Sequence, residues 1–256
     1  MISLLLALIL APLPALASFD LLKENAVYNG TPVGPGGQGW KSTAKLWFGG
    51  GSCTGVFIAR DLILTAAHCG HKEALSELYI SLYLENSTDA TLITVPKAEF
   101  KYFSHPGYVR PKGTDRGTND LALIVLKGET LPSEFTPAEF LTAGETALET
   151  AFLVGAGLTH KDEPSDRLYF TKGSITDYIA GDMMEVHTPL TQGICAGDSG
   201  SPLFQPVGET LKLSAITVSI VPNINKKCGN AVFATIITQS RYEWLMRVAQ
   251  KGRSAD

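Results

Sequence analysis

The chain has 256 residues, of which 45% are hydrophobic and 18% are charged, and its formal net charge at pH 7 is -4. A nucleic-acid-binding protein normally carries a basic surplus, so this charge argues against one, and the ordinary apolar content argues against a disordered chain. The length fits one large all-β domain or two small ones.

The N-terminal segment predicts export. Residues 1–17 are apolar except for Ser3, are interrupted by Pro12 and Pro14, and end in the small-x-small triplet Ala15-Leu16-Ala17. The run is shorter than the roughly 20 residues that a membrane-spanning helix needs. We therefore expect a signal peptide that is cleaved before Ser18, with an uncleaved membrane anchor as the alternative. The mature protein is expected to be secreted, extracellular or periplasmic, and free of the membrane.

Short strands dominate the rest of the chain. Segments rich in Val, Ile, Leu, Thr and aromatic residues are separated by Gly, Pro, Asn and Asp at intervals of about 8–15 residues, which predicts an antiparallel sandwich or barrel. The polar segment Glu129–Glu145 could link two halves. The expected strands are Lys45–Phe48, Thr54–Ile58, Leu62–Thr65, Leu78–Leu84, Leu92–Val95, Leu121–Leu126, Ala151–Val154, Leu211–Ile220 and Ala231–Ile237.

One helix is predicted, over Gln239–Lys251. Tyr242, Leu245, Met246 and Ala249 recur on one face at helical spacing, and Gly252 is expected to end the helix.

The four cysteines are expected to form two disulfides. An even number of cysteines in an exported chain is typical of a disulfide framework, and three connectivities are open at this point. None of the spacings is a CxxC pair, so we expect no zinc or other metal site. The cysteines are Cys53, Cys69, Cys195 and Cys228.

Three local strings carry the residues of a nucleophilic mechanism. They are Thr65-Ala-Ala-His68-Cys69, Asn119-Asp120-Leu-Ala-Leu123 and Gly197-Asp-Ser199-Gly-Ser-Pro-Leu203. A serine hydroxyl needs an imidazole to remove its proton, and the imidazole needs a carboxylate to fix its tautomer. The oxyanion that forms needs backbone N–H donors, and a glycine two residues before the serine lets the backbone approach closely.

Together, these strings resemble the signatures of the chymotrypsin-like, or trypsin, family of serine endopeptidases. The order His, Asp, Ser separates the chain from subtilisin-like enzymes and α/β-hydrolases, and the resemblance extends from Val27 to Ala249. It implies that His68 is the general base and acid, Asp120 its orienting carboxylate and Ser199 the nucleophile. The N–H groups of Gly197 and Ser199 would form the oxyanion hole.

The same resemblance implies the fold and the disulfides. We expect two six-stranded Greek-key barrels, over about 27–135 and about 136–238, with the active site in the cleft between them and a terminal helix over about 239–251. Cys53 would pair with Cys69, and Cys195 with Cys228, although the spacing around Cys228 departs from the family pattern.

The substrate pocket departs from that of trypsin. Gly193 stands where trypsin-like enzymes carry an acidic residue, and a neutral floor cannot compensate the desolvation of a Lys or Arg side chain. Ile194 and Ala231 add apolar bulk. Ser219, or in a second register Thr217, precedes the strand that pairs with substrate, and Val221 would narrow the mouth. These residues predict a preference for aliphatic or medium apolar P1 residues.

Activation is expected to require removal of a prosegment, residues 18–26. In the family, the new α-amino group pairs with the Asp before the nucleophile, which here implies that Val27 pairs with Asp198. The residue before Val27 is Ala26, so a trypsin-like activator is not implied; Lys23 is the alternative cleavage point.

The predicted protein is a monomeric secreted serine endopeptidase without a cofactor. It would act on protein or peptide substrates and could bind protein protease inhibitors. A catalytically inactive homologue that acts as a binding or regulatory protein is the main alternative, and an exported esterase is the second.

Overall fold

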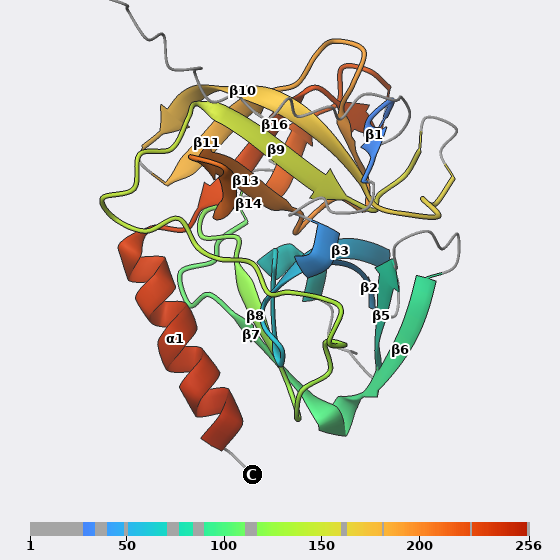
Figure 1. Cartoon of the computed structure of the whole chain (residues 1–256), viewed down its shortest axis with the longest axis vertical. Coiled ribbons are helices and arrows are strands. Elements are labelled where there is room, and N and C mark those ends of the chain that lie inside the picture. Colours follow the sequence, from blue (N-terminus) through green and yellow to red (C-terminus); the bar gives the residue numbers. More distant parts are fainter. Residues whose placement is uncertain are drawn as a thin grey trace, which may run out of the picture.

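The computed structural model describes residues 28–33, 40–48, 51–70, 77–83, 90–110, 117–159, 163–180, 182–225 and 227–254. The predicted signal peptide, the predicted prosegment and Val27 lie outside the described residues. Within them, the chain is mostly β with one α-helix, as predicted, and it is built from two sheet units with the helix at the C-terminal end (Figure 1).

The elements follow one another in the following order. The strands of the first half are β1 (Thr31–Pro32), β2 (Thr43–Phe48), β3 (Gly51–Ala59), β4 (Leu62–Thr65), β5 (Glu77–Tyr83), β6 (Ala90–Pro96), β7 (Phe100–Ser104) and β8 (Ala122–Leu126). Those of the second half are β9 (Thr150–Gly155), β10 (Tyr169–Ile179), β11 (Met183–His187), β12 (Ile194–Cys195), β13 (Pro202–Val207), β14 (Thr210–Val221), β15 (Cys228–Gly229) and β16 (Ala231–Ile236). The short 3-10 turns η1 (Trp40–Ser42), η2 (Ala67–Gly70) and η3 (Lys97–Glu99) and the helix α1 (Gln239–Ser254) complete the list.

The second unit is a closed barrel of six antiparallel strands. The order is β10-β11-β16-β14-β13-β9, and the additional pairing of β9 with β10 closes the ring. Strand β1, from the start of the described chain, is added to the outside of this ring through β10. Closure leaves no free edge strand within the ring itself.

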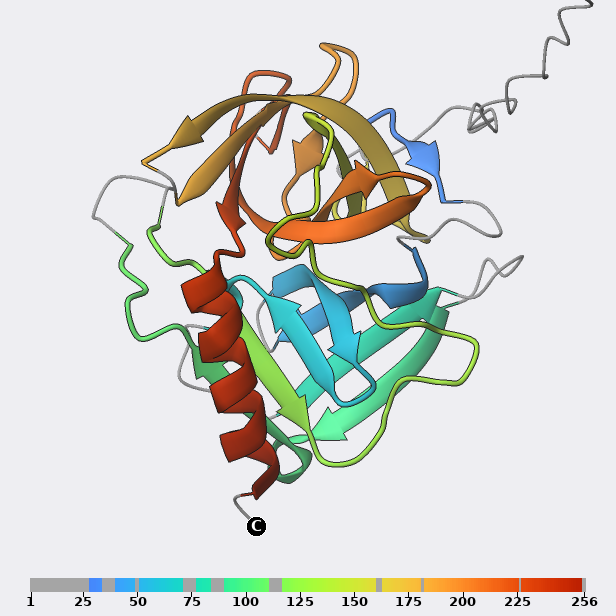
Figure 2. The same ribbon diagram turned by 60° about the vertical axis from the view of Figure 1, so that its left-hand side comes forward.

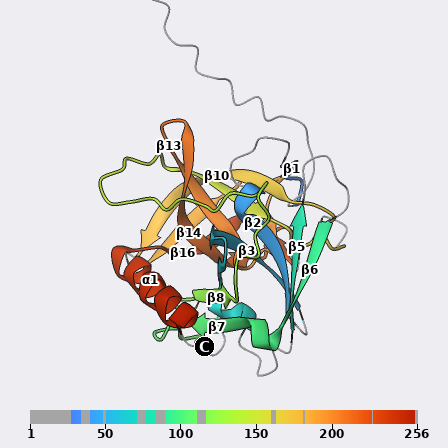
Figure 3. The ribbon, with the colours of Figure 1, turned by 60° about the horizontal axis from the view of Figure 1, so that its bottom comes forward.

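The first unit is a curved half-barrel sheet of seven strands, where the family resemblance implied a six-stranded Greek-key barrel. Its order is β6-β5-β2-β3-β4-β8-β7, and every neighbouring pair is antiparallel. The two end strands, β6 and β7, are joined only by the three-residue turn η3, so the chain bends from one end strand straight into the other (Figures 1 and 3).

A continuous apolar core joins the two units. Leu46, Ile80 and Leu123 of the first unit are fully buried, and they belong to the same cluster as Phe204 and Phe233 of the second. Since burial of apolar side chains is the main favourable term in folding, this shared cluster holds the two units together. The segment between β8 and β9, which contains Glu129–Glu145, runs over both units, as expected for the connection (Figure 2).

Helix α1 packs along the first unit, beside β7 and β8 (Figures 1 and 2). It runs from Gln239 to Ser254, so Gly252 does not end it. A Cβ at Gly252 would lie 2.7 Å from Cγ2 of Val125, which shows that this glycine allows close packing against β8. The buried face is also shifted from the predicted one, because Tyr242 is exposed while Arg241, Trp244, Leu245, Ala249 and Gly252 are buried.

Within the described residues, no helix is both long and apolar enough to cross a lipid bilayer.

Candidate active site

His68 lies in the turn η2, directly after β4 of the first unit. Tyr102 of β7 fixes this turn, because its hydroxyl accepts a hydrogen bond from the Gly70 N–H and lies 3.0 Å from the carbonyls of both Ala66 and Ala67. Burial raises the pKa of the Tyr102 hydroxyl well above its usual range, so the hydroxyl keeps its proton and remains a donor. The backbone that carries His68 is therefore held by side-chain contacts as well as by the sheet.

Asp120 contacts His68 through both carboxylate oxygens. Oδ2 lies 2.7 Å from Nδ1 of the ring, and Oδ1 accepts the backbone N–H of His68 at 2.9 Å. Asp120 is only 2% exposed and lies two residues before the start of β8. An ionised carboxylate can only accept hydrogen bonds, so the neutral imidazole carries its proton on Nδ1 and presents Nε2 as an acceptor. This is the tautomer that a general base requires.

Ser199 lies in the loop between β12 and β13 of the second unit, and a residue of the first unit holds it there. The backbone N–H of Thr54 donates to the Ser199 carbonyl at 2.8 Å, and the Thr54 hydroxyl donates to the Gly197 carbonyl at 3.0 Å. The same hydroxyl accepts the Ala156 N–H at 3.4 Å. Thr54 therefore joins the loop that carries Ser199 to strand β3.

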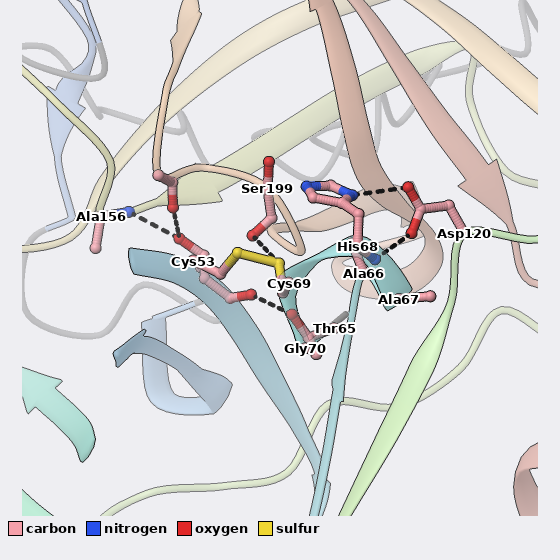
Figure 4. Close-up of a disulfide and its surroundings, with 12 residues drawn as sticks. Cys53, Thr65, Ala66, Ala67, His68, Cys69, Gly70, Asp120, Ala156 and Ser199 are labelled. Atoms are coloured by element: carbon pink, nitrogen blue, oxygen red, sulfur yellow. Dashed lines mark hydrogen bonds and ion pairs between the residues drawn. A yellow bond between two sulfur atoms is a disulfide. The ribbon is translucent and has the colours of Figure 1, made fainter. Parts of the chain in front are cut away.

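The three side chains meet at one cleft. His68 and Ser199 both line a cavity of about 250 Å³, and in Figure 4 the His68 ring lies between the side chains of Ser199 and Asp120. The other lining residues are Arg110, Ile194, Cys195, Ala196, Thr217, Val218, Ser219, Ile220, Pro222 and Lys227. The structure thus brings together residues that are 52 and 79 positions apart in the chain, from both units.

The loop before Ser199 has a fixed backbone. The Ala196 carbonyl accepts the Leu158 N–H at 2.9 Å, and the Asp198 carbonyl accepts the Ser201 N–H at 3.0 Å. Because the N–H of a trans peptide points opposite to its carbonyl, the N–H groups of Gly197 and Ser199 point away from these partners. Gly197 has a φ of +94°, and a Cβ there would lie 3.0 Å from Cα of Gly157, so a side chain would disturb this geometry.

Asp198 is completely buried beneath the loop. Its carboxylate accepts the Gly157 N–H at 2.7 Å and the Cys195 N–H at 2.9 Å. Burial raises the pKa of Asp198 to about 6, and it outweighs these two hydrogen bonds and the nearby Lys45, which lower that pKa. Lys45, in β2 of the first unit, is itself only 2% exposed, and burial lowers its pKa.

Both implied disulfides are present. Cys53 of β3 is bonded to Cys69 of η2, and Cys195 is bonded to Cys228. Cys195 and Cys228 lie directly opposite each other in the two-stranded ladder of β12 and β15, which accommodates the unusual spacing. His68 lies close to the first disulfide, but the sulfurs of Cys53 and Cys69 are oxidised and cannot act as thiolate ligands for a metal.

The predicted pocket residues divide into two groups. Ile194 and Ser219 line the cavity together with the alternative residue Thr217, whereas Gly193, Val221 and Ala231 are not among its described lining residues. A Cβ at Gly193 would lie 2.5 Å from Cδ1 of Ile224, so side-chain atoms already fill the space above this glycine.

Sequence reasoning missed Thr54, Lys45 and Arg241. Thr54 begins the predicted strand Thr54–Ile58, but no local pattern shows that it contacts a loop 143 residues later. Lys45 lies inside a predicted strand and Arg241 inside the predicted helix, and both positions are expected to be solvent-exposed for a charged residue. Their burial is a tertiary feature without a sequence signal.

Comparisons with known proteins agree with this geometry. The family model described as Trypsin matches residues 27–244. No match was found among the curated proteins. Among solved structures, neuropsin, a serine protease expressed in the limbic system of mouse brain, is 21% identical with a TM-score of 0.64, and the match covers 86% of this chain and 98% of that one. This structural likeness shows the fold, while the family model covers most of the chain, and the chain therefore belongs to the trypsin family of serine endopeptidases.

Proposed function

We propose that His68, Asp120 and Ser199 form the catalytic triad of an active peptidase. The observation that carries this proposal is the 2.7 Å contact between Asp120 and Nδ1 of His68, beside a cavity that Ser199 also lines. Oγ of Ser199 attacks the scissile carbonyl while Nε2 of His68 takes its proton, and this proton then passes to the leaving amine. Water then hydrolyses the resulting acyl-enzyme, with His68 taking a proton from the water and returning a proton to Oγ of Ser199.

The backbone N–H groups of Gly197 and Ser199 are proposed to bind the oxyanion. Their orientation, opposite to the hydrogen-bonded carbonyls of Ala196 and Asp198, supports this role. Donors that are fixed before the reaction stabilise developing charge without reorganisation.

Covalent labelling tests the triad. The processed chain should react with a fluorophosphonate probe at Ser199, whereas Ser199→Ala should fold and remain unlabelled. An unlabelled parent chain would instead favour the catalytically inactive homologue. Matched peptide and ester substrates then separate a peptidase from an esterase. A peptidase should cleave the peptide with a kcat/KM comparable to that for the ester, whereas an esterase should cleave only the ester efficiently.

The P1 pocket is proposed to accept aliphatic or medium apolar side chains. Ile194, Val218 and Ile220 supply apolar lining, and no described lining residue is acidic. A P1 Arg or Lys would therefore lose hydration without gaining a counter-ion. Kinetics on peptides that differ only at P1 test this, and an Arg peptide cleaved faster than Val, Leu and Phe peptides would contradict it. A Glu peptide in the same series tests whether Arg110 and Lys227, which also line the cavity, admit an acidic residue.

The chain is further proposed to be a secreted zymogen activated by cleavage before Val27. Its first described residues support this, since the Tyr28 carbonyl accepts the Gly193 N–H at 3.2 Å and Asn29 donates to the Thr191 carbonyl at 2.9 Å. These contacts bring the segment after Val27 to the unit that holds Asp198, whose buried carboxylate would gain a cationic partner. Terminal sequencing of the active enzyme should read Val-Tyr-Asn-Gly, and full activity in a chain that starts at Ser18 would refute the scheme.

Two disulfides fit an extracellular protein. Protein substrates follow from the family, and we propose a monomer that protein protease inhibitors can block at the same cleft. Size-exclusion chromatography of the processed chain tests the oligomeric state.

A further inference from the structure

Arg241, in the first turn of α1, is a buried cation that the proposed mechanism does not use. It is 2% exposed, and its guanidinium contacts residues of both units. Nε and Nη2 donate to Oδ1 of Asn119 at 3.1 and 2.8 Å. Nη1 donates to the carbonyls of Asp182 and Ile236 at 2.9 and 2.7 Å, and Nη2 forms an ion pair with Oδ1 of Asp182 at 3.1 Å.

These contacts are too specific for a residue that only docks the helix. A guanidinium carries its N–H groups in a rigid fork, and here they make four hydrogen bonds, with an ion pair to Asp182 in addition. Burying a charge is costly, and an apolar side chain of similar volume would pack the helix at least as well. The contacts therefore indicate that one of the partners of Arg241 has to be held in a fixed position.

The partner with such a requirement is Asn119, which directly precedes Asp120. Asn119 has a φ of +50°, in the left-handed region, which asparagine adopts more readily than most L-residues and which its contacts stabilise further. Its amide does this from two sides: Oδ1 accepts from Arg241, while Nδ2 donates to the Gly107 carbonyl at 3.1 Å. The direction in which the chain leaves Asn119 sets where the Asp120 side chain points.

The other partners of Arg241 lie in the second unit. Asp182 is in the connection between β10 and β11, and Ile236 is the last residue of β16. One guanidinium thus joins the residue before Asp120, in the first unit, to the barrel that carries Ser199. We propose that Arg241 is a positioning residue of the catalytic site, which holds Asp120 in register with His68 through Asn119. This inference rests on the triad proposed above.

Substitution of Arg241 by methionine tests the proposal. A misplacement of about 1 Å in a catalytic group can reduce the rate by about 10²-fold, so we expect Arg241→Met to lower kcat on that order while KM changes less than about twofold. Arg253→Met is the matched control. Arg253 lies on the same helix and pairs with Asp61, and its replacement should leave kcat unchanged. An unchanged kcat in Arg241→Met would overturn the proposal.

A second background separates positioning from a general structural effect. If Arg241 acts through Asp120, then Arg241→Met should cause no further loss of kcat in an Asp120→Asn chain, because the carboxylate it positions is already gone. A loss in that background equal to the loss in the parent would overturn the proposal. Full activity of Asp120→Asn would instead refute the triad itself, so the two failures are distinguishable.

Asn119→Gly covers the case in which Arg241→Met fails to fold. Glycine adopts a positive φ readily, so this variant keeps the local backbone accessible while removing both amide contacts. We expect a reduced kcat with an unchanged KM, as for Arg241→Met, and a full parental kcat would overturn the proposed route through Asn119.

Discussion

The buried carboxylate of Asp198 should make the unprocessed chain less stable as the pH rises. Burial raises the pKa of Asp198 to about 6 in the folded chain, against 3.8 for an unperturbed carboxyl. The folded state therefore holds this proton more tightly than the unfolded state does, and the resulting stabilisation is complete below about pH 3.8 and is lost as the pH rises through about 6. A difference of about two pKa units corresponds to about 3 kcal/mol of unfolding free energy.

The measurement is a difference between two chains. Urea unfolding of Ser199→Ala and of the double variant Ser199→Ala/Asp198→Asn, followed by tryptophan fluorescence between about pH 4 and about pH 7.5, gives two stability curves. Every other titrating group is common to both chains, so their difference isolates Asp198. The unfolding free energy of Ser199→Ala, taken relative to that of the double variant, should fall by about 2 kcal/mol across this range, because part of the full effect is already lost at pH 4. A pH-independent difference would refute the reasoning.

Processing should abolish this pH dependence. If the α-amino group freed at Val27 pairs with Asp198, the added positive charge lowers the pKa of the carboxyl, and the penalty at neutral pH falls. The same difference curve, measured on chains that begin at Val27, should be nearly flat. A curve as steep as that of the unprocessed chain would contradict the proposed pairing while leaving the burial argument intact.

Three further substitutions test the surroundings of the site. Lys45→Met should move the titration of Asp198 to higher pH, because a cation that lowers the carboxyl pKa is removed, and an unchanged midpoint in the unfolding difference curve would contradict this. Gly193→Asp should lower the Tm without creating cleavage after Arg, since its Cβ would lie 2.5 Å from Cδ1 of Ile224; matched peptides and thermal unfolding report both effects. Gly197→Ala, at a φ of +94°, should cost about 1–3 kcal/mol in stability and lower kcat by about 10²-fold, and a parental kcat would argue against an oxyanion role for this loop.

Strands could be predicted from the sequence where the buried side chains are large and apolar. Strand β4 matches its predicted bounds, Leu62–Thr65, because all four of its side chains are buried. Strand β10, Tyr169–Ile179, was missed. Its inward positions include Thr171 and Gly173, which give no apolar alternation, and Gly173 is required because a Cβ would lie 2.5 Å from Cγ1 of Val186. Close packing of β10 against Val186 therefore requires a glycine at a position where the alternating pattern of a strand would place a large apolar residue.

Local sequence patterns also misplaced the end and the buried face of helix α1. Gly252 has the usual signature of a helix end, yet it is a packing position against Val125 and the helix continues to Ser254. Tyr242 has the spacing of a core residue, but Arg241 occupies the interior beside it because partners from two distant segments satisfy its N–H groups. A periodic pattern shows which residues share a face, whereas burial of a charge depends on acceptors that only the folded chain brings together.

The proposed catalytic residues could be found in the sequence because each lies in a local string, but the contacts that hold them have no such signal. An apolar interface is favourable over a range of small displacements, since the hydrophobic effect is not directional. Hydrogen bonds have narrow ranges of distance and angle, so they can fix the relative position of two packed units. Thr54 supplies such bonds at the Ser199 end of the site, and Arg241 supplies them at the Asp120 end. In the first case a residue of the first unit holds the loop that carries Ser199, and in the second the helix after the second unit holds the residue before Asp120. Catalysis at the proposed site between the two units would depend on such polar contacts, because the apolar core that joins the units cannot by itself set an alignment of about an ångström.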